Sequence, residues 1–237
     1  MRPTSDDNRM RKASFGPAAE NHTINYDEHM KYICFSFLYP HQLWRMITVN
    51  LIHMGWFHLL SNLSKQLMYG ILLERKYGSV RVITLYWLSE FGASLNSMLS
   101  GSRNFGVGSS GAIFGVMLFF IVERFSAMKN NVNHRISILI QLVLLVVLPM
   151  TISICQIIIL KIDPAHSAHL GGGLVGVLFG IGMFGCPCLY NNEHNFCQTI
   201  CRRTAFGVLF LYFVISLIIV FRTNAPFLGS IMSTNPS

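Results

Sequence analysis

The chain has 237 residues, of which 52% are hydrophobic and only 12% are charged. Charged residues make up about 25% of a typical soluble domain. This composition, with a mean hydropathy of +0.47, indicates a polytopic membrane protein and excludes an ordinary soluble enzyme. The formal net charge is +8, but the Lys and Arg residues stand at the ends of apolar runs, not in a patch with interleaved aromatic residues. We therefore expect the lipid bilayer as a partner, and no nucleic acid.

Residues 1–43 are predicted to form a polar tail ahead of the membrane region. This tail has no apolar h-region, so it is not a secretory signal peptide. Its acidic residues Asp6 and Asp7 argue against a mitochondrial transit peptide. An apolar patch at residues 32–39 is too short to span a bilayer. Asn21-His22-Thr23 is an acceptor sequence for N-glycosylation.

Six apolar runs follow the tail, and each is a candidate membrane span. They cover residues 55–73, 80–100, 110–125, 136–160, 165–185 and 205–221. We expect an all-α, polytopic transmembrane helix bundle over residues 44–222 and a C-terminal tail over residues 223–237. The run from Ser110 is about 24 Å long, shorter than a bilayer core of about 30 Å, which predicts a helix that begins below the membrane surface. Pro149 is predicted to kink the fourth run.

The basic residues beside these runs are unevenly divided between the two sides of the predicted bundle. One side carries Arg75, Lys76, Arg81, Arg124, Lys129, Arg135, Arg202 and Arg203, whereas the other carries only Arg45, Arg103, Lys161 and Arg222. The side richer in Lys and Arg stays in the cytosol. The Ser110 end of the third run is therefore predicted to face outward.

A Gly-rich segment, residues 107–109, leads directly into the run that begins at Ser110. A serine at this place sits at the positive end of the helix dipole, among N–H groups that have no partner within the helix. These are the surroundings of a nucleophile beside an oxyanion site. A helix N-cap serine with packing glycines is the alternative interpretation.

The fifth run carries small residues on one helical face. His169, Gly172, Gly173, Gly176 and Gly180 share this face. Small residues let two membrane helices approach closely, and Gly111 and Gly115 give the Ser110 helix a matching groove. Packing of the two faces would bring His169 to Ser110, as a nucleophile and its base require. A packing histidine bonded to a backbone carbonyl is the alternative.

The first run opens with two polar residues on one helical face, His58 and Asn62, at positions i and i+4. Both side chains can donate hydrogen bonds to a developing oxyanion. His53 is expected to point elsewhere and to have a structural role.

We expect no metal and no cofactor. His53, His58, His166 and His169 stand in no His-Glu-x-x-His pattern. A loop with Cys186, Cys188, His194, Cys197 and Cys201 does not have the usual spacing of zinc ligands. Palmitoylation or inert thiols are favoured for these cysteines.

Two charged residues lie inside predicted spans, Lys65 in the first and Glu90 in the second. Since the two runs are joined by a short loop, both charges are expected at a similar depth, and an unpaired charge there costs at least about 2.5–3.5 kcal/mol. We predict a structural ion pair between Lys65 and Glu90. The alternative is that Lys65 extends toward the headgroups and Glu90 is protonated.

Three motifs together resemble those of the rhomboid intramembrane serine proteases. They are Gly108-Ser109-Ser110-Gly111-Ala112-x-Phe114-Gly115, Ala168-His169-x-Gly171-Gly172 and His53-x4-His58-x3-Asn62. Trp44-Arg45 is similar to the Trp-Arg pair in the first external loop of that family, and Glu74 and Gly78 resemble the end of its His/Asn helix. The resemblance covers about residues 43–222.

This resemblance implies an intramembrane serine endopeptidase that works by a Ser-His dyad, with Ser110 as nucleophile and His169 as general base. It also implies that His58, Asn62 and the Ser110 amide bind the oxyanion, with no acidic third member. A further set is expected to be structural: Trp44, Arg45, Gly108, Gly111, Gly172 and Gly176.

The resemblance further implies single-pass transmembrane proteins as substrates, cleaved where their helix unwinds near the outer membrane face. The kinked fourth span would lie beside their access route. A span after the His169 helix is similar to the eukaryotic secretase-type arrangement, which favours the secretory pathway or plasma membrane over the mitochondrion. The membrane helix that normally precedes the Trp-Arg loop in this family is not among the predicted spans.

Two other functions compete with proteolysis. One is a catalytically inactive rhomboid-like protein that binds or escorts membrane clients; such proteins usually lose the serine or the histidine, and this chain has both. The other is a channel or transporter, for which the expected inverted repeat and paired broken helices are not found. The protease is the favoured interpretation.

Overall fold

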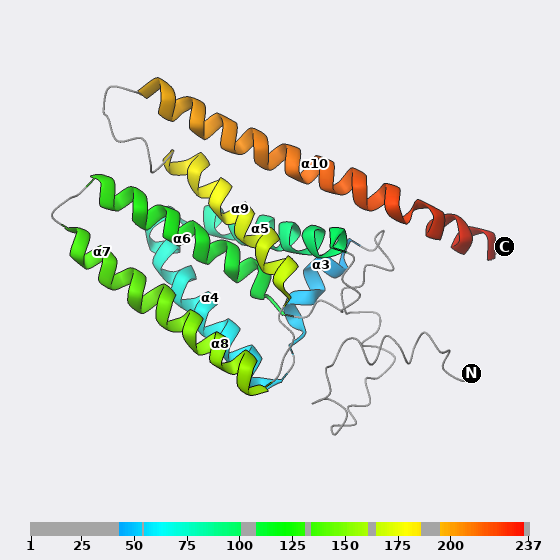
Figure 1. Ribbon diagram of the computed structural model, residues 1–237, viewed down its shortest axis with the longest axis horizontal. Coiled ribbons are helices and arrows are strands. Elements are labelled where there is room, and N and C mark those ends of the chain that lie inside the picture. Colours follow the sequence, from blue (N-terminus) through cyan, green and yellow to red (C-terminus); the bar gives the residue numbers. More distant parts are fainter. Residues whose placement is uncertain are drawn as a thin grey trace.

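The computed structural model describes residues 43–53, 55–100, 108–130, 134–160, 165–185 and 195–234. These residues form an all-α helix bundle (Figure 1), as the sequence predicts. Its elements are α3 (Arg45–Thr48), the 3-10 turn η2 (Val49–Leu51), α4 (Trp56–Tyr77), α5 (Ser79–Leu99), α6 (Ser110–Asn130), α7 (Arg135–Leu142), the π-helical segment η4 (Val143–Val147), α8 (Leu148–Leu160), α9 (His166–Phe184) and α10 (Asn195–Thr234). Residues 1–42 lie outside the described part.

All six predicted runs are helical, but they differ in apolarity. Among the residues that the structure describes, four stretches are long and apolar enough to cross a membrane: Ser110–Met128, Arg135–Ile159, His166–Phe184 and Phe196–Arg222. The helices α4 and α5 are also long, with 22 and 21 residues, and they carry most of the polar side chains described below. The chain is therefore an integral membrane protein.

The third helix is longer than predicted. α6 has 21 residues and ends at Asn130, so at about 1.5 Å per residue it spans about 31 Å, and the expected start below the membrane surface does not follow from its length. Within the predicted run, the Glu123 carboxylate is only 3% exposed and accepts hydrogen bonds from Lys76, Tyr77 and Arg124. α10 likewise extends beyond the predicted 205–221 in both directions.

The centre of the bundle is built from α5, α6 and α9, whose backbones touch at glycines. A Cβ atom at Gly172 would overlap the carbonyl oxygen of Gly111, and one at Gly176 would overlap that of Gly115. A Cβ at Gly115 would in turn overlap the Ser89 side chain of α5. The predicted contact between the small faces of the two helices is therefore present.

The fourth run is a single rod of α7, η4 and α8 that lies beside α4 and α6, whereas α10 lies along α9 on the other side (Figure 1). Its π-helical segment ends two residues before Pro149. A proline cannot donate to the carbonyl four residues earlier, which here belongs to Leu145. The hydroxyl of Tyr69 on α4 donates to that carbonyl instead.

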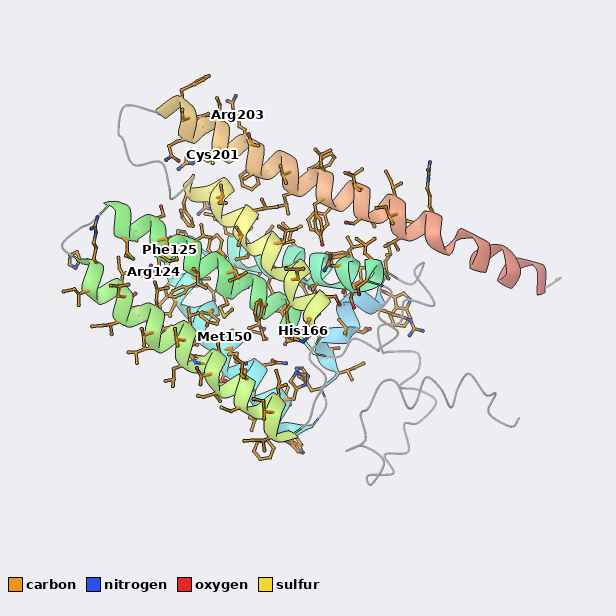
Figure 2. All side chains as sticks on the ribbon, in the orientation of Figure 1. Arg124, Phe125, Met150, His166, Cys201 and Arg203 are labelled. Carbon is orange, nitrogen blue, oxygen red and sulfur yellow. The ribbon has the colours of Figure 1, made fainter. Side chains whose placement is uncertain are left out.

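The bundle has two chemically different ends. Figure 2 shows Arg124, Cys201 and Arg203 at one end, and His166 and Met150 toward the other. This separation agrees with the charge pattern of the sequence, which predicts basic residues at the end opposite Ser110.

Candidate active site

Ser110 and His169 lie in contact at the ends of their helices. Ser110 is the first residue of α6, and His169 is in the first turn of α9. The Nε2 atom of His169 is 3.0 Å from the Oγ atom of Ser110. This is the distance at which an imidazole nitrogen accepts the proton of an attacking hydroxyl.

The imidazole of His169 is held flat against an aromatic ring. The ring of Phe114 stacks on it with 4.9 Å between centroids and 15° between planes. Phe114 follows Ser110 by four residues on α6, so the same helical face positions both the hydroxyl and the ring that orients its partner. The sequence signal for this role of Phe114 is its i+4 spacing from Ser110.

The segment before Ser110 approaches α4 too closely for a side chain. Gly108 has a φ of 93°, in the region that favours glycine. A Cβ there would lie 2.8 Å from Cε1 of His58 and 3.3 Å from Nδ2 of Asn62. The N–H of Gly108 donates to the carbonyl of Val49, at 3.0 Å. Gly108 thus joins the Ser110 segment to both α4 and η2.

His58 and Asn62 contact each other beside Gly108. Nδ2 of Asn62 lies 3.1 Å from Nε2 of His58, and the Asn62 side chain is buried. The first N–H groups of α6 have no partner inside their own helix. The side chains of His58 and Asn62 therefore lie beside Gly108, two residues before Ser110 and the free N–H groups at the start of α6.

The sequence predicts that His53 points away from this region, and this prediction is wrong. Its ring meets that of His58 edge to face, with 5.3 Å between centroids. Partial burial lowers the pKa of His53 below its ordinary value.

The segment of α3 and η2 braces the site from the outside. Arg45 is buried, and its guanidinium lies 5.0 Å from the centroid of the Trp44 ring, which is 46% exposed. Asn50 accepts a hydrogen bond of 2.8 Å from the hydroxyl of Tyr86 on α5.

Further along α5, Asn96 donates to the carbonyl of Ser167, at 2.7 Å. The sequence does not predict these contacts of Tyr86 and Asn96, because the partner of a single polar residue in an apolar helix cannot be identified from its position in the chain.

The predicted ion pair between Lys65 and Glu90 is wrong. Lys65 of α4 donates to Oγ of Ser153 on α8, at 2.5 Å. Glu90 of α5 is 3% exposed and accepts from Ser94, at 3.4 Å. The two residues do lie on neighbouring helices, α4 and α5. However, the rotation of each helix about its axis directs Lys65 toward α8 and Glu90 toward the first turn of α6.

The described residues contain no group of three or more His, Cys, Asp or Glu side chains that could hold a metal ion. Cys197 and Cys201 lie on α10. The other members of the predicted Cys-rich loop, Cys186, Cys188 and His194, lie outside the described residues.

Comparison with known proteins gives the family. Residues 40–186 match the Rhomboid domain. The chain belongs to the rhomboid family. The match includes every candidate site residue of this rhomboid chain, from Trp44 to Gly176.

Several relatives of this rhomboid chain are known by name. RHOMBOID-like protein 1 of Arabidopsis thaliana is 33% identical over 67% of the chain and 39% of its own length. Rhomboid-like protease 1 of Toxoplasma gondii is 33% identical over 65% of the chain and 49% of its own length. Inactive RHOMBOID-like protein 8 of Arabidopsis thaliana is 34% identical over 42% of the chain and 28% of its own length. The chain thus spans less than half the length of these relatives, and no solved structure matches it.

Proposed function

We propose that this chain is an intramembrane serine endopeptidase that cleaves transmembrane segments of single-pass membrane proteins. The observation that carries the proposal is the 3.0 Å contact between Ser110 Oγ and His169 Nε2. It is supported by the donors gathered beside it and by the rhomboid family, whose members include a protein named as a protease.

In the proposed reaction, the Ser110 hydroxyl attacks the carbonyl carbon of the scissile peptide while Nε2 of His169 takes its proton. His58, Asn62 and the Ser110 N–H donate to the oxyanion that forms. His169 then returns the proton to the leaving amine, and the C–N bond breaks to leave an acyl ester on Ser110. Water, deprotonated by His169, hydrolyses this ester and restores the serine. Phe114 keeps the imidazole plane fixed throughout.

The second candidate is a catalytically inactive rhomboid-like protein that binds membrane clients. One relative is named as inactive, so family membership alone does not decide between the two. The retained Ser110–His169 contact favours catalysis, because a pure binding protein has no need of an activated hydroxyl.

Fluorophosphonate labelling of the purified full chain tests the proposal. The wild-type chain is expected to form a covalent adduct, and Ser110→Ala and His169→Ala are each expected to abolish both the adduct and substrate cleavage. Ser109→Ala and His166→Ala are the matched controls, since each changes a like residue within three positions, and they should retain most activity. An adduct that persists in Ser110→Ala contradicts the assignment, and an unlabelled wild type that still binds a membrane client supports the inactive alternative.

A further inference from the structure

α4 carries three polar side chains on one face. His58, Asn62 and Lys65 stand at positions i, i+4 and i+7, so Lys65 extends the stripe that already supplies two groups to the site. At 1.5 Å per residue, Lys65 lies about 10 Å along the helix from His58, toward the end of α4 that carries Lys76.

The ammonium group of Lys65 has little to bind. Its partner among the described residues is the hydroxyl of Ser153, at 2.5 Å, which itself donates to the Pro149 carbonyl, at 2.9 Å. Within the described part of the chain, Glu123 forms ion pairs with Lys76 and Arg124, and Lys65 forms none. An ammonium has three donors and no acceptor, so one neutral hydroxyl leaves most of its capacity unused.

Lys65 lies where α4 meets α8, since it bonds to Ser153 of that helix. The side of α8 that faces α4 contains Pro149, Met150, Ser153 and Ile157, and all four are only half-buried. The most apolar stretch of the α7–α8 rod, within Arg135–Ile159, has no buried residue. Figure 1 shows this rod at the edge of the bundle, beside α4. A segment that enters between α4 and α8 would therefore pass the ammonium group before it reaches the site.

We infer that Lys65 is a specificity residue that pairs with an acidic side chain of the substrate segment. The inference rests on the proposed protease function and names its substrate class, transmembrane segments with an Asp or Glu close to the cleaved bond. A carboxylate is costly in a membrane segment unless it finds a partner, and an ammonium bound only to a hydroxyl is a matching partner. Since an extended chain advances about 3.3 Å per residue, the 10 Å offset places the acid about three residues from the cleaved bond, on its deeper side.

A purely structural role is the competing explanation, in which Lys65 pins α4 to α8 through Ser153. The two roles predict different effects on substrate preference when the Ser153 hydroxyl is removed. If Lys65 only pins the helices, Ser153→Ala and Lys65→Met must have the same effect. If Lys65 reads the substrate, Ser153→Ala keeps the cation and therefore keeps the substrate preference.

The test uses the full chain in proteoliposomes with one transmembrane substrate in three forms, which carry Asp, Asn or Lys three residues from the cleaved bond. Wild type is expected to cleave the Asp form at least about tenfold better than the Asn form in kcat/KM, as for a hydrogen bond to a charged group. Lys65→Met should remove this preference by slowing the Asp form, Lys65→Glu should shift it to the Lys form, and Ser153→Ala should retain it. When the Asp is moved along the substrate segment, the preference for Asp over Asn should be largest about three residues from the cleaved bond.

Equal cleavage of the Asp and Asn forms by wild type overturns the inference, as does an equal loss of preference in Ser153→Ala and Lys65→Met. The wild-type comparison decides the matter even if both Lys65 variants fail to fold. Fluorophosphonate labelling of the same wild-type preparation separates the two proposals. A chain that is labelled but shows no charge preference contradicts only the role of Lys65, whereas a chain that is neither labelled nor active contradicts the protease function.

Discussion

At the scale of single residues, the candidate site depends on close contacts that leave no room for a larger residue or for another orientation of a side chain. Gly108 is the clearest case, since a side chain there would meet both His58 and Asn62. Phe114 holds His169 in one plane, and Asn62 holds His58. Each polar group near Ser110 is thus oriented by a neighbour, which is what preorganised stabilisation of a transition state requires.

Asn62 is expected to contribute to the rate but not to be indispensable. Asn62→Ala should lower kcat by about 10²–10³, the usual effect of one lost oxyanion donor, with a smaller change in KM. Steady-state cleavage of a transmembrane substrate measures this. Gln66→Ala, one turn further along α4 and away from Gly108, is the control. Unchanged kcat in an Asn62→Ala, His58→Ala double variant would argue against the role of this pair.

At the scale of helices, the site exists because α6 and α9 touch along their backbones. The carbonyl of Gly111 occupies the place that a Cβ atom at position 172 would take. In the same way, the carbonyl of Gly115 occupies the place of a Cβ atom at position 176. Ser110 and His169 stand at the near ends of these two helices, so the spacing between the helices sets the distance between the two side chains.

Gly172→Ala is expected to separate the helices and to damage stability and labelling together. Overpacking of a close contact typically costs about 1–3 kcal/mol. Gly70→Ala on α4 is the control, because a Cβ there meets no atom within 4 Å and helical Ala is favoured over Gly by about 0.5–1 kcal/mol. Thermal unfolding in detergent and the rate of fluorophosphonate labelling provide the two measurements. Equal behaviour of the two variants would mean that the glycine contact does not determine the site.

At the scale of the whole molecule, charge and chemistry are separated between the two ends of the bundle (Figure 2). Arg124 and Arg203 lie at one end, and His166, three residues before His169, lies toward the other. Since the end rich in Lys and Arg remains in the cytosol, Ser110 and His169 are expected to face the lumen or the exterior.

This orientation predicts glycosylation of the N-terminal tail when the chain is inserted into endoplasmic reticulum membranes. Asn21 precedes the outward-facing start of α4 and lies in an acceptor sequence, so it should gain a glycan that endoglycosidase removes. Asn21→Gln is the control for a shift in electrophoretic mobility. An unmodified Asn21 in a tail that protease cannot reach from the lumenal side would reverse the orientation.

The sequence by itself determined the helices, the pairing of Ser110 with His169 and the glycine face between them. These features depend on the length of apolar runs and on helical periodicity, which are local properties of the chain. Only the tertiary structure decided the partners of the lone polar groups: Lys65 bonds to Ser153 and not to Glu90, His53 meets His58, and Glu123 bonds to Lys76 and Arg124. The physical reason is that the rotation of each helix about its axis is set by packing against all its neighbours, and a side chain's partner changes with that rotation although its position in the sequence does not.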